Sequence, residues 1–219
     1  LQERGLLHGP DVHPRLARWL QTLAHPDDEV DVRWRDGTDE LRGTLVRRGE
    51  TTVRVVRRGE ALTFTPVTPG SMPSAAVDLL PDVPAATTGG QISAPTEQLS
   101  AAYTAAAASI QAGTSALTAL GAERADARAL AAALITTEAV SQIGAATTVR
   151  GRRVRHPSVV AVLDTGRGRY VSSERAAPDH RLWSTVRPAT GAHLVRAATE
   201  LLADVQADAL RRTGTALRL

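Results

Sequence analysis

Two residue types, cysteine and lysine, are absent from the 219-residue sequence. Without cysteine, the chain cannot form disulfides, use a thiol in catalysis or hold zinc through thiolates. Without lysine, it cannot build a Walker A phosphate loop, a pyridoxal Schiff base or a serine–lysine catalytic pair. These two absences exclude several large classes of enzyme, and they leave arginine as the residue type of all 26 basic side chains.

Aromatic residues are also scarce, with one Phe, three Trp and two Tyr, so we expect a core of Leu, Val and closely packed Ala. The length allows one large domain or two small ones. The net charge of +3 is mild. The six histidines lack the spacing of metal ligands, so no metal site is expected, and no cofactor is expected either. The lack of cysteine, and of any apolar run near 18 residues, indicates a cytoplasmic protein.

The first half, residues 1–80, has the pattern of a helix, an antiparallel meander and a short helix. Apolar residues at helical spacing between Pro14 and Pro26 predict the first helix. Short turns with Gly49 and Gly59 separate alternating segments, which predicts neighbouring antiparallel strands. The predicted strands span residues 29–35, 41–48, 51–58 and 61–67, and the short helix spans residues 73–80.

Residues 81–95 are rich in Pro, Gly and Thr, which predicts a linker. The second half, residues 96–219, repeats the order of helices, antiparallel strands and a final helix. Its first helix is expected to begin near Ser93 and Pro95 and to end at Gly113. The remaining predictions are a helix over residues 122–135, strands over 139–149, 158–163, 169–173 and 183–187, and a long helix after Pro188.

The triplet Asp164-Thr165-Gly166 follows an apolar run and allows two interpretations. Aspartic proteases carry this triplet, but their chemistry needs two carboxylates that share a proton. Here Arg167 stands where a small residue is expected, and the sequence holds no second triplet. An Asp-initiated turn in a β-hairpin is therefore favoured, and an unrecognised hydrolase remains a distant alternative.

Arginine residues mark a candidate binding surface. Arg33 and Arg35 alternate with apolar residues in one predicted strand, and Arg54 and Arg58 do so in another. Because successive side chains of a strand point to opposite faces, we predict one apolar sheet face and one arginine-bearing face. Residues 150–155 add four arginines in one expected loop. A solvated face and a docking surface both stay open as interpretations, with a nucleic-acid site third.

The order of the motifs resembles the EspG family, cytosolic chaperones of the actinobacterial type VII (ESX) secretion systems. In the second half the resemblance rests on an apolar strand, a D-T-x-x-G-R-[YF] turn, a tryptophan, a Pro-[GA]-Thr helix start and a leucine pair. These are residues 159–163, Asp164 to Tyr170, Trp183, Pro188-Ala189-Thr190 and Leu201-Leu202. In the first half the similar segments are residues 3–6, 16–23, 24–26, 30–33 and the hairpin over 46–59.

The resemblance implies an α+β fold, with a central antiparallel β-sheet, helices packed on it and two pseudo-symmetric halves in one compact unit. It also implies a non-enzymatic chaperone that binds helical-hairpin export substrates of the PE/PPE kind, and that is a monomer or homodimer when unliganded. The sequence begins at Leu1, where the resemblance implies the middle of a helix preceded by a further segment with a strand.

The partner-binding surface is expected on the arginine-bearing sheet face and on the C-terminal helix, where Leu194 and Leu201 share one face. The candidate contact residues are Arg33, Arg35, Arg54, Arg58, Leu194 and Leu201. The alternative function is that of a nucleic-acid-binding regulator that uses the same arginines. The small net charge and the lack of aromatic stacking platforms disfavour that alternative.

Overall fold

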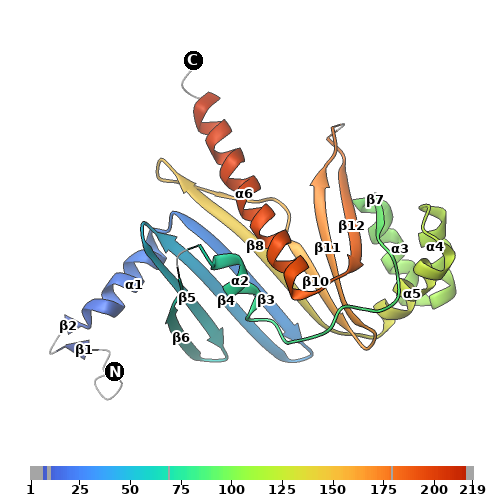
Figure 1. Cartoon of the computed structure of the whole chain (residues 1–219), viewed down its shortest axis with the longest axis horizontal. Coiled ribbons are helices and arrows are strands. Elements are labelled where there is room, and N and C mark those ends of the chain that lie inside the picture. Colours follow the sequence, from blue (N-terminus) through green and yellow to red (C-terminus); the bar gives the residue numbers. More distant parts are fainter. Residues whose placement is uncertain (1–6, 9–10, 69, 179, 216–219) are drawn as a thin grey trace.

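The chain folds around one ten-stranded antiparallel sheet, seen in a computed structural model that describes residues 7–8, 11–68, 70–178 and 180–215 (Figure 1). Residues 1–6, to which the expected helix at Leu1 belongs, lie outside the described residues. A separate pair of two-residue strands, β1 (Leu7–His8) and β2 (Asp11–Val12), precedes the main fold. None of the described helices is long and apolar enough to cross a membrane.

The first half forms a four-stranded meander between two helices. The strands are joined by turns in which Gly37, Gly49 and Gly59 adopt φ angles of 52°, 53° and 58°, a conformation that favours glycine. Each predicted strand is confirmed to within two residues at either end. In chain order the elements are α1 (Pro14–Ala24), β3 (Asp28–Asp36), β4 (Asp39–Arg48), β5 (Thr51–Arg58), β6 (Ala61–Pro66) and α2 (Met72–Val77).

The second half repeats this order, with extra helices before its strands. Its four long strands and its final helix are confirmed, with bounds shifted by up to three residues. In chain order the elements are β7 (Ile92–Pro95), α3 (Thr96–Ala108), α4 (Ile110–Ala119), α5 (Arg124–Ile135), β8 (Thr137–Val149), β9 (Arg152–Arg155), β10 (Val160–Thr165), β11 (Gly168–Ala176), β12 (Leu182–Pro188) and α6 (Gly191–Thr215).

The two meanders meet where β3 pairs with β8. The strand order is β6-β5-β4-β3-β8-β10-β11-β12-β7, with β9 paired to β8. On each side of this seam, further antiparallel strands are added one after another towards the edge of the sheet. Two pseudo-symmetric halves require such an arrangement. The central antiparallel β-sheet with helices packed on it is confirmed.

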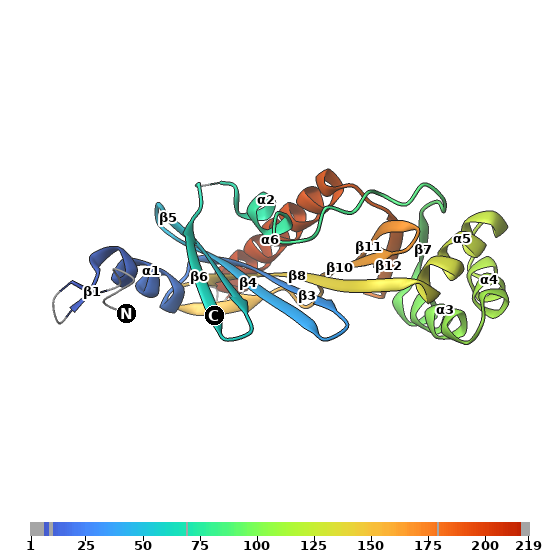
Figure 2. The ribbon, with the colours of Figure 1, turned by 90° about the horizontal axis from the view of Figure 1, so that it is seen from below.

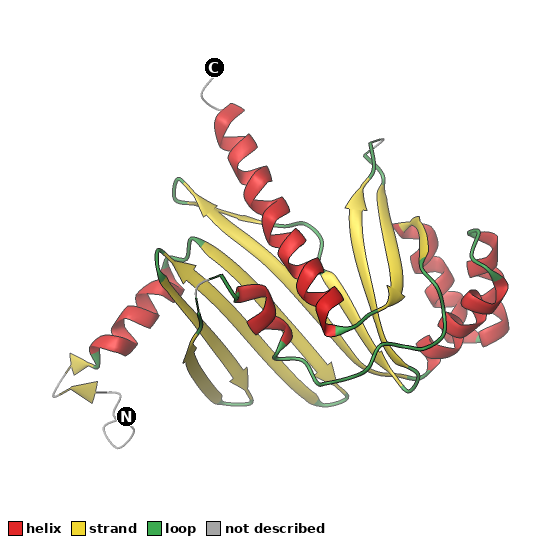
Figure 3. Ribbon diagram, viewed as in Figure 1, coloured by secondary structure: helices red, strands yellow, loops and turns green. Residues whose placement is uncertain are grey.

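Helices cover the two faces of the sheet unevenly. Helices α2 and α6 pack on one face, called the helix face, over core residues that include Val30, Leu45 and Ile143 (Figures 2 and 3). On the other face, α1 packs at one end over β4 and β5, and α3 and α5 pack at the other end around Tyr170 and Val186. In the part of the chain that the structure describes, no helix covers the middle of this second face, called the open face.

Three predictions for the second half were wrong in detail. The helix expected to end at Gly113 breaks earlier, at Ser109, and α4 begins there because Ser109 Oγ accepts a hydrogen bond from the N–H of Ala112. Residues 81–95 are a linker only in part, since β7 adds an edge strand to the sheet. Residues 152–155 form β9 instead of a loop.

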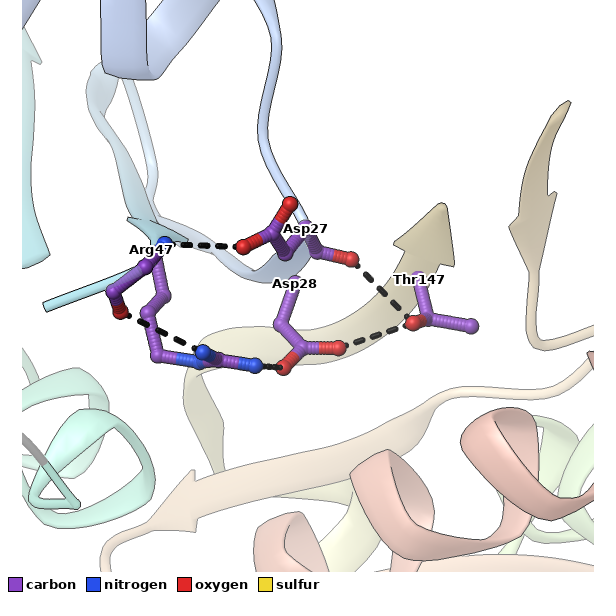
Figure 4. A network of polar contacts seen from close by, with 5 residues as sticks. Asp27, Asp28, Arg47 and Thr147 are labelled. Atoms are coloured by element: carbon purple, nitrogen blue, oxygen red, sulfur yellow. Dashed lines mark hydrogen bonds and ion pairs between the residues drawn. The ribbon is translucent and has the colours of Figure 1, made fainter. Parts of the chain in front are cut away.

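A polar network joins the seam between the halves (Figure 4). Asp28 of β3 accepts hydrogen bonds from Arg47 of β4, with Nε 3.1 Å from Oδ2, and from Thr147 of β8, with Oγ1 2.8 Å from Oδ1. Burial raises the pKa of Asp28, but hydrogen bonds from Gln206, Arg47 and Thr147 outweigh burial, so the net pKa lies below its usual value. One buried carboxylate thus connects both meanders and α6.

The Asp164-Thr165-Gly166 triplet lies at the β10–β11 hairpin, as predicted. Thr165 Oγ1 donates to the carbonyl of Gly168, and it accepts from the N–H of Arg167, which closes the turn. Asp164 itself is buried and pairs with buried Arg169. Arg169 also donates to the carbonyl of Pro81, so this hairpin anchors the start of the segment that connects the two halves.

Candidate partner-binding surface

The register of the strands decides which side chains share a face, because residues directly opposite each other in neighbouring strands point the same way. Val30 lies opposite Leu45, and Leu45 lies opposite Arg54, so Arg54 belongs to the helix face. Arg33 lies opposite Arg42, and Arg42 lies opposite Arg57, on the open face. Three arginines of successive strands therefore form one line across the sheet.

The prediction that Arg33, Arg35, Arg54 and Arg58 share one face was wrong. Arg33 and Arg35 are exposed on the open face, whereas Arg58 is exposed on the helix face and Arg54 is half-buried there. An Arg54 Nη1 donates to the carbonyl of Ala75 in α2 at 3.4 Å. The physical reason is that α1 covers β5 on the open face, so the buried valines of β5 lie under α1 and not on the apolar face of β3.

Leu194 and Leu201 are also not available as contact residues. Leu194 is fully buried and Leu201 is 6% exposed, in the core between α6 and the sheet. Their helical spacing was read correctly, but the shared face is the one that packs on β8. A partner could reach them only if α6 left the sheet.

Arg33, Arg42 and Arg57, called the arginine row, lie side by side on β3, β4 and β5. Local acceptors hold two of their guanidinium groups: Arg42 Nε lies 2.5 Å from Glu40 Oε1, and Arg57 Nε lies 3.0 Å from the carbonyl of Gly59. In the described residues, no carboxylate lies within ion-pair distance of Arg33 or Arg57. Within the row, Arg42 therefore has Glu40 as a counter-ion, and the guanidinium groups of Arg33 and Arg57 have none among the described residues.

The pKa of Glu40 reports the positive field of this region. The hydrogen bond from Arg42 lowers it below its usual value, and the charges of Arg42, Arg35 and Arg57 act in the same direction. Beside these residues a hollow of about 320 Å³ opens between the β3–β4 and β5–β6 turns, with lining residues that include Asp39, Glu40, Arg42 and Arg57.

Elsewhere on the open face, arginines are neutralised within the chain. Arg153 Nη2 lies 2.8 Å from Glu29 Oε2, and Arg155 Nη1 lies 2.5 Å from Asp31 Oδ1. These two pairs attach β9 to β3 across β8. Arg153 and Arg155 thus have their charges satisfied by carboxylates of β3, whereas in the described residues no ion pair is found for Arg33, Arg35 or Arg57.

The line of the arginine row continues across the sheet in both directions. Leu62 lies opposite Arg57 and is 59% exposed, and Gln142 lies opposite Arg33. Beyond Gln142 the line reaches Ala161 and Ser172, which border a groove of about 250 Å³ beside α3. Burial raises the pKa of Tyr103 in this groove to about 12, so its phenol is neutral.

Arg42 and Arg57 were missed by reading the sequence. The signal that could have found them is the length of the turns, because two-residue turns fix the pairing of the strands on either side. Counting outward from residues 37–38 and 49–50 places Arg33, Arg42 and Arg57 in one line. Among the described residues, no group of three His, Asp or Glu side chains could hold a metal ion.

Comparisons with known proteins agree with this architecture. The sequence profile of the EspG family matches residues 1–200. Over 55 residues the chain is 40% identical to the ESX-3 secretion-associated protein EspG3 of Mycolicibacterium smegmatis, a stretch that covers 25% of this chain and only 19% of that protein.

The fold is similar to that of a Mycobacterium tuberculosis type VII secretion system chaperone, EspG5, whose structure was solved in complex with a PE25–PPE41 dimer. The TM-score is 0.78 with 23% sequence identity, and the match covers 92% of this chain and 83% of that one. At this identity the likeness establishes the shared fold. Because the family profile extends over most of the sequence, the chain belongs to the EspG family.

Proposed function

We propose that this chain is a cytosolic chaperone of a type VII secretion system that binds PE/PPE-like helical-hairpin substrates and keeps them soluble and competent for export. The observation that carries the proposal is family membership over residues 1–200. The complex of EspG5 with a PE25–PPE41 dimer supports it, since that protein has the same fold. The uncovered middle of the open face offers a surface of the required kind.

Such a chaperone acts by binding alone and needs no nucleotide or cofactor. A helical hairpin with an exposed apolar tip is prone to aggregation, and a protein that covers the tip shifts the equilibrium towards the soluble form. The side chains of the hairpin triplet support a binding role over catalysis. Asp164 is buried in an ion pair with Arg169, so its carboxylate is already occupied.

The docking surface in this proposal is the open face. Of the residues suggested by the sequence, Arg33 and Arg35 remain candidates, and Arg42 and Arg57 join them. The proposal leaves out Arg54, Leu194 and Leu201, which are half-buried or buried, and Arg58, which lies on the helix face. Arginine is favoured in interfaces since its planar group forms several hydrogen bonds at once.

The test is capture of the substrate in the native host, followed by reconstitution. The tagged full chain is purified from its host, and bound proteins are identified by mass spectrometry. We expect a helical-hairpin pair of the PE/PPE kind that is soluble only when it is co-expressed with this chain. If the captured pair is equally soluble alone, or if no such pair is captured, the proposed function is wrong.

A further inference from the structure

We infer that the arginine row recognises an acidic α-helix of the partner that lies across the strands, with carboxylates one helical turn apart on the side facing the sheet. This inference rests on the proposed function for the identity of the partner. It adds that the contacting segment of the partner is an acidic helix and that this helix runs across the strands.

The charge of the row is the first support. Like charges directly opposite each other in a sheet destabilise it, and Arg33, Arg42 and Arg57 stand in this relation on three successive strands. Elsewhere on the open face the chain supplies its own carboxylates, as Glu29 does for Arg153. In the described part of the chain, Glu40 alone forms an ion pair with the row, so carboxylates from a partner would complete it.

The spacing of the row is the second support. Neighbouring strands lie about 4.8 Å apart, so the Cα atoms of the three arginines span about 10 Å across the sheet. Residues i, i+3 and i+7 of an α-helix share one side and span about 10.5 Å along its axis. An acidic helix perpendicular to the strands therefore places one carboxylate over each arginine. An extended strand parallel to β4 would meet only Arg42.

The orientation of the guanidinium groups is the third support. The Nε atoms of Arg42 and Arg57 are already held by Glu40 and by the carbonyl of Gly59. Their terminal N–H groups stay available for bidentate contact with a carboxylate, which is the geometry that arginine favours. Leu62 at one end of the line offers an apolar contact, and Gln142 at the other end offers a neutral hydrogen bond.

A protein helix fits this surface better than a nucleic acid. Two aromatic rings at the α1 end of the open face, Trp19 of α1 and Phe64 of β6, are stacked on each other with centroids 6.3 Å apart, so they are not free to stack on bases. The described surface around the row thus lacks the platforms that single-stranded nucleic acids use.

The direct test uses the full chain and a labelled, alanine-rich helical peptide with Glu at positions i, i+3 and i+7, read out by fluorescence anisotropy. The control peptide has the same composition, with its Glu residues distributed around the helix. We expect the patterned peptide to bind at least about tenfold more tightly, and Arg57→Glu to weaken it by about tenfold or more. The matched control, Arg152→Glu in β9, makes the same change in net charge at an exposed residue of the helix face, far from the row, and should have little effect.

Several outcomes would overturn the inference: no binding of the patterned peptide at millimolar concentration, equal binding of both peptides, or equal losses in the two variants. Tighter binding of an oligonucleotide than of the patterned peptide would assign the row to phosphates instead. The captured substrate separates this inference from the proposed function. If Arg57→Glu retains the substrate at wild-type yield, the inference fails while the function stands; if the wild-type chain captures no such substrate, the function fails.

Discussion

The guanidinium of Arg169 and the carboxylate of Asp164 form a buried, two-pronged ion pair, with 2.5 Å between Nε and Oδ1 and 2.9 Å between Nη2 and Oδ2. Both side chains lie within the hairpin that also holds the segment connecting the two halves, through the hydrogen bond from Arg169 to Pro81. The triplet that resembles a protease motif thus has a structural role.

Asp164→Asn should destabilise the fold by about 3–5 kcal/mol, because it leaves the charge of Arg169 buried without a partner. Urea denaturation followed by circular dichroism measures this loss. Glu200→Gln is the control, since Glu200 pairs with Arg196 and Arg175 at an exposed site where a loss of about 1 kcal/mol or less is expected. A loss below about 1 kcal/mol for Asp164→Asn would show that the pair does not hold the hairpin.

Asp28 should make folding stability depend on pH at the acidic end. Because its pKa in the folded chain is lowered, its contribution is present above the ordinary pKa of about 4, and is lost as the pH falls through the lowered value. We expect Asp28→Asn to cost about 2–3 kcal/mol at pH 7, with the difference from wild type shrinking below pH 4.

Denaturant melts at pH 7, 5 and 3 check the Asp28 prediction. The matched control is Glu40→Gln, which removes another carboxylate with a lowered pKa, but one at the exposed surface, and should leave stability unchanged. A difference between Asp28→Asn and wild type that stays constant with pH would mean that the charge of Asp28 does not stabilise the seam.

Gly113→Ala should push α3 and α4 apart. A methyl group at residue 113 would come within 2.5 Å of the Cβ of Ala106 and 2.6 Å of its Cα, where backbone cannot yield easily. We expect a loss of about 1–3 kcal/mol in unfolding free energy. Gly191→Ala is the control, because a Cβ there meets no atom within 4 Å. Equal melting temperatures for the two variants would contradict this packing.

Duplex DNA and structured RNA should bind the chain weakly, and the binding should disappear as salt rises, since only counterion release would drive it. Gel-shift titrations from low ionic strength to roughly 200 mM salt measure the effect. Sequence-specific binding that survives the highest salt would favour the regulator function over the chaperone.

Local patterns predicted most of the fold. The meanders were found because glycine turns and alternating residues specify hairpins within a few residues of chain. The break at Ser109 was missed because the surrounding alanines continue the helical pattern on both sides, although the serine itself is a preferred N-cap. Strand β9 was missed because it has little apolar alternation, and its position depends on carboxylates of β3 that are far away in the sequence.

The candidate surface was only half predictable. Alternation within β5 separated Arg54 from its valines correctly, but it could not show that α1 buries those valines on the face opposite to α2 and α6. The pairing register decides which face of one strand continues which face of the next. Apolar residues normally mark the face that packs on the core, but in β5 they mark the opposite face. The residues that line up with Arg33 therefore became visible only in three dimensions.

The uninterrupted hydrogen bonding from β6 to β7 has a thermodynamic consequence for any partner. Because one hydrogen-bonded sheet runs through both halves, the strands between α1 and α3 brace one another and hold the surface in one shape. Most of the conformational entropy lost on association is then lost by the partner. The affinity therefore depends on how closely the partner's free conformation matches the shape of this surface.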